Sequence, residues 1–371
     1  MRIVIAGAGI GGLSAAIALR RAGHEVVVLE RAPQLDAAGA GITLFGNAMR
    51  ALAALGVAEE VAAGGAPARR SAIRTADGRV LTTMAPDRRE GAVAVHRGGL
   101  QAALLAAAGD IRLGAEVIAV DQDAGGVAAT LADGTQERGD LLVGADGVHS
   151  AVRAAVTPAA VRYGGYTAWR GVAPAAIEPG CLQESWGRGE RFGLVDIGSR
   201  TYWFATANTP EGERDDPSRR RAELLERFAG WHAPIGRVLD ATPAEAILRN
   251  DVYFLDPLPR WSRGRVVLLG DAAHATTPGV GQGAALAIED AVVLAAALAR
   301  HDDPARALAS YEKVRRPRAE LVLRLSRRAD RAAQLSSPLG CRARNALTRL
   351  VPRAAQRRQL APLVHHDAPA G

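Results

Sequence analysis

Apolar and polar positions near the start of the chain follow the order strand, helix, strand. Residues 3–6 form an apolar run of strand length, and residues 13–21 show helical spacing with small residues on one face. Gly23 ends this helix, and residues 24–29 have the pattern of a second strand, with three valines in a row. We therefore predict a buried parallel βαβ unit over this segment.

The alternation of helical and strand patterns continues beyond this unit. Residues 47–55 and 96–108 have the spacing of helices, whereas residues 140–144 and 266–269 are apolar runs typical of buried parallel strands. Strands that alternate with helices in this way favour an α/β fold with a parallel sheet.

Aromatic side chains are concentrated in one stretch of the chain. Of the fifteen aromatic residues, eight lie between positions 163 and 204 among β-branched residues. This pattern predicts an antiparallel sheet with one large apolar face, and the strand at 266–269 then resumes the first domain. The eight are Tyr163, Tyr166, Trp169, Trp186, Phe192, Tyr202, Trp203 and Phe204.

The charge of the chain permits several kinds of partner. The formal net charge is +7 and the isoelectric point about 10.1, which would suit nucleic acid, anionic lipid or an acidic substrate. The Arg-rich stretch at 314–331 has apolar residues at helical spacing, so we expect a helix with a solvated face, with a membrane-surface helix as the alternative. We expect no nucleic-acid partner and no membrane-spanning segment.

Cysteine and histidine give no sign of a disulfide or a metal site. Cys181 and Cys341 are 160 positions apart, which favours free thiols and a cytoplasmic protein. We also expect a monomer or homodimer. The one histidine cluster, at 365–367, lies in a Pro/Ala-rich tail that we expect to be unstructured. We therefore predict no metal.

The glycines after the first strand predict an anion site. Gly7, Gly9 and Gly12 form a G-x-G-x-x-G pattern between a strand and a helix, and Glu30 ends the next strand. Glycine lets the backbone approach a pyrophosphate at the positive end of the helix, and a carboxylate at Glu30 can accept hydrogen bonds from ribose. A glycine-rich loop without a ligand is the alternative, but the register of all four features favours a dinucleotide.

Two further acids stand at the ends of predicted parallel strands. Asp146 and Asp271 follow the runs at 140–144 and 266–269, at the sheet edge where open α/β sheets bind ligands. The residues from Pro278 to Gly283 then remove side chains just before a helix. Bare N–H groups at a helix start would stabilise the negative charge of a reduced flavin. We therefore expect FAD rather than NAD as the resident cofactor.

Together these stretches resemble the class A flavoprotein monooxygenases of the p-hydroxybenzoate hydroxylase type. The resemblance rests on GAGIGG with Glu30, on GADGVHSAVR, and on GDAAHATTPGVGQGAALAIEDA, in an order that covers residues 1 to about 330. It implies an α/β fold in which a Rossmann-like FAD-binding domain is interleaved with an antiparallel-sheet substrate domain, followed by C-terminal helices. The expected limits are 1–68, 96–160 and 256–305 for the FAD-binding domain, 69–95 and 161–255 for the substrate domain, and 306–371 for the C-terminal region.

The resemblance also implies which residues contact FAD. One departure from the family pattern is Ala285, where many relatives carry Asn. The implied contacts are Gly9, Gly11 and Gly12 at the pyrophosphate, Glu30 at the ribose, Arg31 and the backbone of Val117 near the adenine, Arg97 and Asp271 at the phosphate and ribityl groups, Asp146 between FAD and the reductant, and Gly281, Gln282 and Gly283 at the flavin.

In enzymes of this type NADH or NADPH reduces FAD, and oxygen then adds at flavin C4a. The resulting hydroperoxide transfers OH to an electron-rich aromatic or heteroaromatic small molecule. Two alternatives stay open from the sequence alone. One is a flavin reductase or dehydrogenase of the same superfamily, and the other is a non-catalytic FAD-binding redox sensor.

Candidates for the substrate side follow from strand alternation. Tyr202 and Phe204 share one strand face and Trp203 the other, so only one of these sets can line a pocket. We choose Tyr202 and, on the neighbouring strand, Arg191 for an anionic substrate, with a surface arginine as the alternative. Pro278 should lie at the flavin edge. His274 should lie there too, as a packing or hydrogen-bonding group rather than a base.

Overall fold

A computed structural model describes residues 1–35, 40–84 and 91–366 of the chain. One half is built on a six-stranded sheet in which all neighbouring strands are parallel except the edge pair β18 and β19. The strand order is β18 (Ser262–Arg263), β19 (Val266–Leu268), β12 (Leu141–Gly144), β1 (Arg2–Ala6), β2 (Glu25–Leu29) and β8 (Ile111–Arg112). The predicted βαβ unit and both later buried strands are therefore confirmed.

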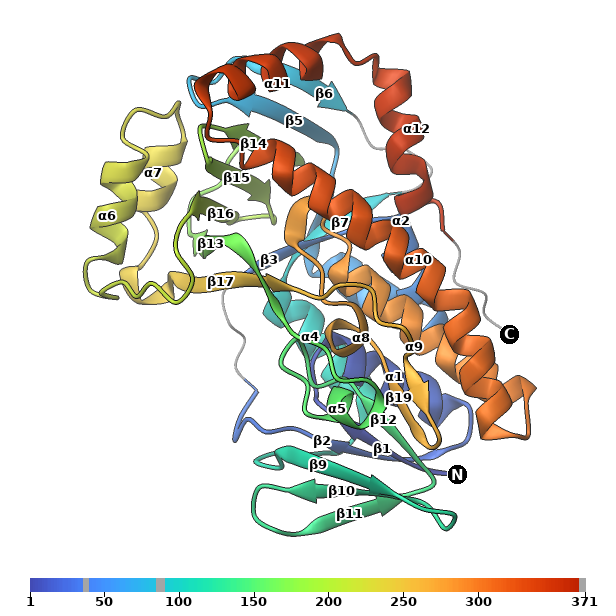
Figure 1. The fold of residues 1–371 in the computed structure, drawn as a ribbon. Coiled ribbons are helices and arrows are strands. Elements are labelled where there is room, and N and C mark those ends of the chain that lie inside the picture. Colours follow the sequence, from blue (N-terminus) through green and yellow to red (C-terminus); the bar gives the residue numbers. More distant parts are fainter. Residues whose placement is uncertain (36–39, 85–90, 367–371) are drawn as a thin grey trace.

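Helices and a small sheet cover this parallel sheet (Figure 1). Helix α1 packs against both α4 and α9, and it begins at Ile10 rather than at residue 13 as expected. In the small sheet, made of β9, β10 and β11, β10 contacts β12 and β11 contacts β1. Helix α5 contacts β19. The elements are α1 (Ile10–Arg21), α4 (Arg97–Ala108), α8 (Asp271–His274), α9 (Gly283–Arg300), α5 (Val152–Val156), β9 (Val117–Gln122), β10 (Val127–Leu131) and β11 (Gln136–Gly139).

The aromatic stretch forms the centre of a seven-stranded sheet. All its neighbouring strands are antiparallel except β14 and β5, so the predicted antiparallel sheet is confirmed with one parallel pair. Helices α6 (Arg220–Arg227) and α7 (Ile235–Asp240) cover part of one face (Figure 1). The order is β17 (Leu248–Phe254), β13 (Arg162–Ala173), β16 (Thr201–Asn208), β15 (Glu190–Asp196), β14 (Cys181–Trp186), β5 (Arg70–Thr75) and β6 (Val80–Met84).

Glycines opposite β16 allow its aromatic rings to lie flat on the sheet. Trp203 pairs in register with Gly171 and stacks on Phe192, toward the α6–α7 side. Phe204 points the other way and pairs with Gly193, where a Cβ atom would lie 2.0 Å from the Phe204 ring. Large side chains at these glycines would displace the rings, so glycine at both positions fixes the two faces of the sheet.

A fourth sheet, of three strands, joins the two halves. It has the order β3 (Gly41–Leu44), β7 (Ala92–His96) and β4 (Gly65–Ala68), next to α2 (Gly46–Ala54) and α3 (Ala58–Ala63). We had placed residues 69–95 in the substrate domain. Within this range β5 and β6 join the seven-stranded sheet, whereas β7 pairs with β3 and β4.

The C-terminal part consists of three helices, α10 (Pro304–Ala333), α11 (Pro338–Leu350) and α12 (Arg353–Val364). The expectation of a solvated face for 314–331 is wrong for two of its arginines, because Arg315 and Arg318 are buried and form ion pairs with Glu289. The expectation of an unstructured tail is also wrong as far as the structure describes it. Helix α12 precedes the histidine pair, and His366 contacts Arg315 at 3.3 Å, while Asp367 lies outside the described residues.

Replacement of the buried Arg315 should destabilise the protein strongly. Arg315→Leu leaves Glu289 and Asp290, both fully buried, without their shared partner, so we expect a loss of about 3 to 5 kcal/mol in the free energy of unfolding. Arg306→Leu is the control, since the Arg306 side chain is 81% exposed, and should change it by less than about 1 kcal/mol. Urea unfolding measures both, and equal effects of the two variants would contradict the prediction.

Candidate active site

A cavity of about 990 Å³ lies where the parallel sheet, the seven-stranded sheet and α12 meet. Its lining combines the starts of α1, α8 and α9 with side chains from β5, β6, β14, β15 and β16. Most of the predicted site residues line it, while the others lie outside the lining. The residues that line the cavity are Gly9, Gly11, Arg97, Arg191, Tyr202, Asp271, Pro278, Gly281 and Gly283.

The glycine turn before α1 is built from close backbone approaches. Gly7 has φ +101°, and a Cβ atom at Gly12 would lie 1.9 Å from the Gly7 carbonyl oxygen. A Cβ atom at Gly9, by contrast, would meet no protein atom within 4 Å. Helix α1 has no side-chain cap and no acid in its first turn, so its first N–H groups require an external acceptor. This turn fits a diphosphate.

Glu30 ties the end of β2 to this turn. Its carboxylate accepts hydrogen bonds from the N–H groups of Ala8 at 2.8 Å and Ala32 at 2.9 Å. Its backbone carbonyl accepts from the N–H of Ala115, two residues before Val117. Glu30 and Val117 therefore stand near the glycine turn without lining the cavity, and Arg31 is exposed beside Glu30.

The two acids at the strand ends are placed differently. Asp146 follows β12 and lies beside Gly7, with one carboxylate oxygen accepting from the N–H of Val152 and the other, buried, without a partner among the described residues. Asp271 is the first residue of α8 and lines the cavity. Desolvation by the surrounding protein raises the pKa of Asp271, whereas the charges of His274 and Arg97 act in the opposite direction.

The side-chain amide of Asn47 connects the loop before α9 to the helix by two hydrogen bonds. The side-chain N–H₂ of Asn47 donates to Gln282 at 2.9 Å and to Glu289 at 2.6 Å. Gly281 takes a left-handed conformation with φ +64°, and α9 begins at Gly283 without a side-chain cap. The first N–H groups of α9 thus face the same cavity as those of α1, which suits a ring that carries negative charge.

His274 and Asp290 form a buried pair under this site. Nε2 of His274 lies 2.6 Å from the Asp290 carboxylate, which also accepts from the N–H of Gly270. Burial alone would raise the pKa of Asp290, but His274 and Arg315 lower it to about 2. Since His274 is buried and does not line the cavity, its position fits the hydrogen-bonding role and not that of a base.

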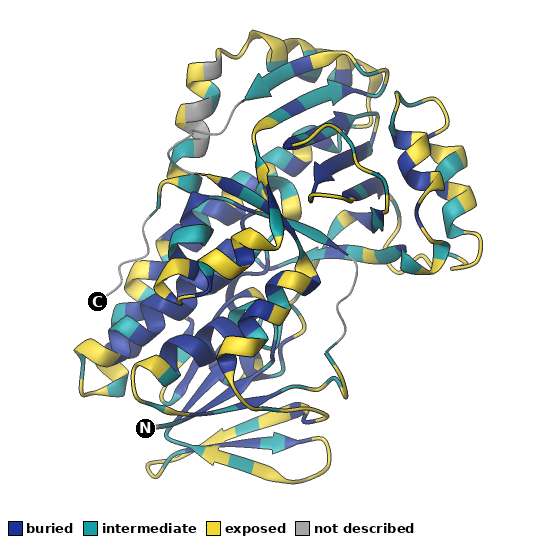
Figure 2. Ribbon diagram, turned by 180° about the vertical axis from the view of Figure 1, so that it is seen from behind, coloured by how far each residue is buried: buried dark blue, intermediate teal, exposed yellow. Residues whose placement is uncertain are grey.

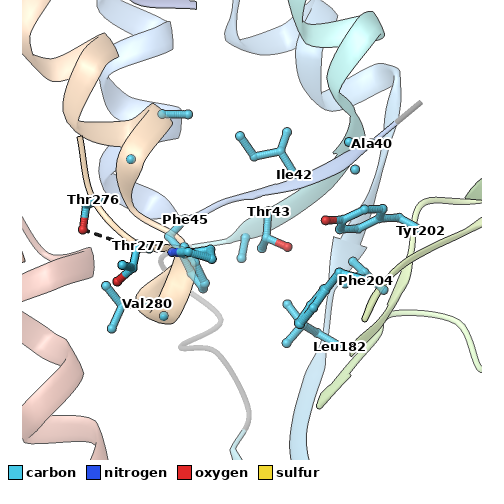
Figure 3. Close-up of a pocket in the computed structure, with 18 of the residues that line it drawn as sticks. Ala40, Ile42, Thr43, Phe45, Leu182, Tyr202, Phe204, Thr276, Thr277 and Val280 are labelled. Carbon is cyan, nitrogen blue, oxygen red and sulfur yellow. Dashed lines mark hydrogen bonds between the residues drawn. The ribbon is translucent and has the colours of Figure 1, made fainter. Parts of the chain in front are cut away.

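Aromatic and apolar side chains line the part of the cavity away from the glycine turns (Figure 3). Tyr202 and Phe204 come from β16 and face Phe45 and Thr43. The Tyr202 ring lies on the backbone of β3, because a Cβ atom at Gly41 would come within 2.3 Å of it. Burial raises the pKa of Tyr202, so its phenol stays protonated at neutral pH.

Arg191 is buried at 3% exposure, which excludes the alternative of a surface arginine. Its guanidinium pairs with Glu184 at 3.4 Å and with Asp330 at 3.0 Å, and it lies over the ring of Tyr166. Two carboxylates already compensate its charge. The sequence did not point to Glu184, Asp330 or Asn47, since no motif links these distant positions.

The departure at Ala285 falls inside α9. Ala285 is buried and does not line the cavity.

Among the described residues no group of three or more His, Cys, Asp or Glu side chains could hold a metal ion, and Cys181 and Cys341 are free. No helix in the described part of the chain is long and apolar enough to cross a membrane.

Two uncapped helix starts that face one cavity, next to an aromatic pocket, fit an FAD-dependent monooxygenase. The chain belongs to the family described as "FAD binding domain", whose model matches residues 1–326. It is similar to aurachin C monooxygenase/isomerase of Stigmatella aurantiaca, with 44% identity over 95% of this chain and 94% of that protein.

Two further similarities support the assignment. The chain is 37% identical to 2-heptyl-3-hydroxy-4(1H)-quinolone synthase of Pseudomonas aeruginosa over 96% of both proteins. The crystal structure of Klebsiella pneumoniae HpxO complexed with FAD and uric acid matches with a TM-score of 0.90 and 32% identity over 98% of this chain and 97% of that one. The chain is therefore an FAD-dependent aromatic hydroxylase, in a class that uses NAD(P)H, rather than a flavin reductase or a redox sensor.

Alanine at Gly9 and at Gly12 should separate cofactor contact from folding. Gly9→Ala meets open space and an extended backbone, so the thermal stability of the FAD-free protein should stay unchanged while FAD binding weakens by roughly tenfold or more. Gly12→Ala collides with the Gly7 carbonyl and should lower both. Flavin fluorescence and thermal melts measure the two effects, and unaltered FAD affinity in Gly9→Ala would contradict the assignment.

Proposed function

We propose that this monooxygenase hydroxylates a fused heteroaromatic ring that carries an apolar substituent, of the quinoline or quinolone type, rather than urate. The observation that carries the proposal is the apolar extension of the cavity. The cavity extends from the loop before α9 past β5 and β6 to α12. The apolar side chains in this extension are Ile73, Met84, Leu182, Ala361 and Val364.

The ion pairs of Arg191 support the same substrate class. Because Glu184 and Asp330 already compensate Arg191, an anionic substrate would gain little from it. A neutral ring with a polar oxo or amino group would instead accept or donate single hydrogen bonds. The relatives with quinolone-type names, at 44% and 37% identity, point in the same direction.

We assign roles to the residues of this chain as follows. FAD, when bound, would supply the redox and oxygen chemistry. Gly9 and Gly11 would hold its diphosphate, and the start of α9 would hold its ring. The phenol of Tyr202, protonated because burial raises its pKa, donates a hydrogen bond to an oxygen of the substrate ring. Arg191, fixed by its two ion pairs, orients Glu184 at the pocket wall. Pro278, with Phe45, excludes water from the ring. The enzyme acts in the cytoplasm as a monomer or homodimer.

The substrate class can be tested with a series of 2-alkyl-4(1H)-quinolones. If the apolar extension buries even two of the additional CH₂ groups, at about 0.8 kcal/mol each, then the heptyl compound should exceed the methyl compound in kcat/KM by roughly tenfold or more. NAD(P)H consumption, with ¹⁸O from O₂ traced into the product, measures this. Faster coupled turnover of urate, or no ¹⁸O in any product, would rule out the proposed substrate or the proposed reaction, respectively.

The hydroxyl of Tyr202 should matter for coupling. Tyr202→Phe keeps the ring on Gly41 but loses one hydrogen bond of about 0.5 to 1.5 kcal/mol, so kcat/KM should fall by roughly 2- to 10-fold while peroxide release rises. Tyr163→Phe is the matched control, since the Tyr163 hydroxyl bonds Thr209 and does not line the cavity. Equal effects of the two variants on peroxide release would exclude the proposed role of Tyr202.

A further inference from the structure

Helix α11 presents an apolar face to solvent. Four of the nine exposed large apolar side chains among the described residues lie between positions 339 and 351. Leu339, Leu347 and Leu350 are 74%, 63% and 76% exposed. The other five are scattered singly over the molecule, which is normal for a surface, whereas a cluster on one helix indicates an interaction site.

The opposite face of α11 fixes its orientation. Arg344 and Cys341 are buried there, and Arg344 donates to the backbone carbonyls of Ala333 and Gly187 and lies over the ring of Trp186. At roughly 100° per residue, the face made of Leu339, Ala343, Leu347 and Leu350 points away from these contacts. We call this set the α11 face.

The charged side chains of the chain segment that carries the α11 face are all basic. Residues 331–366 contain seven arginines and no aspartate or glutamate. Arg342 and Arg349 are exposed on the flank of the apolar face. An amphipathic helix with leucines on one side and arginines beside them binds the interface of a membrane that carries anionic lipid.

The neighbouring helix places the pocket next to this surface. On α12, Arg358, Ala361 and Val364 line the cavity, while Ala354 and Ala355 are exposed, so α12 forms the outer wall of the pocket. Both α11 and α12 contact β6 (Figures 1 and 2). A membrane against the α11 face would therefore lie close to the pocket wall made by α12.

We propose that the α11 face is a peripheral membrane-docking surface, whose partner is a bilayer with anionic headgroups. Leucines insert at the level of the headgroups and arginines pair with lipid phosphates. The alternative of a membrane-surface helix at 314–331 does not fit α10, because Arg315 and Arg318 are buried there. An apolar substrate dissolved in the bilayer would reach the pocket along α12, and this last step alone rests on the proposed function.

Vesicle sedimentation with the FAD-loaded protein tests the docking surface without turnover. Vesicles of phosphatidylcholine with roughly 30% phosphatidylglycerol should bind the protein at least about tenfold better than pure phosphatidylcholine, and added salt should weaken binding. The double variant Leu347→Ser with Leu350→Ser should lose this binding by roughly tenfold or more. Ile118→Ser, 53% exposed on β9, should bind like the unaltered protein.

Three outcomes would overturn the proposal. The first is no binding of the unaltered protein to anionic vesicles, and the second is binding by the double variant that equals that of the unaltered protein. The third is a dimer in gel filtration that only the double variant dissociates, because the α11 face would then be a contact between two copies of the chain. Flavin absorbance of each variant shows that it is folded. Absence of vesicle binding by the unaltered protein, with normal turnover of dispersed alkylquinolone, would reject the membrane surface and leave the proposed substrate class intact.

Discussion

Two adjacent carboxylates at the heart of α9, Glu289 and Asp290, are fully buried, and the rest of the site depends on their compensation. A buried carboxylate is costly unless charges and hydrogen bonds surround it. Arg315 pairs with both at 2.7 Å, and Arg318 adds a further contact to Glu289. Helix α10 must therefore lie against α9, whatever its surface pattern suggests.

The remaining oxygens of this acid pair hold the cofactor loops. Asp290 accepts from the N–H of Gly270, just before the first residue of α8, and from His274 at the end of that helix. Glu289 accepts from Asn47, whose amide also holds Gln282 just before α9. The two loops that face the flavin end of the cavity are thus fixed by one buried polar network, and a network of this kind is effective because every partner orients the next.

Local chemistry made much of this architecture predictable from the sequence. Gly7 and Gly12 could be predicted from the sequence, because only glycine permits the close contacts that the backbone makes at these two positions. Strand alternation also placed Tyr202 and Trp203 correctly on opposite faces of the sheet. The pairing of Arg315 was not readable, since an arginine in an amphipathic helix is usually solvated and its partner lies on another helix. Asp330 was missed for the same reason, because its pairing with Arg191 joins α10 to β15.

Helix α10 consequently touches both halves of the active site. Near its end Asp330 pairs with Arg191 at the substrate wall, and the Ser326 carbonyl lies so near Gly279 that a Cβ atom there would approach to 2.5 Å. One turn separates these two contacts on the helix. A shift of α10 would therefore move the loop over the flavin and the wall of the substrate pocket together. The relative position of the loop before α9 and of the pocket wall at Arg191 is therefore linked through α10.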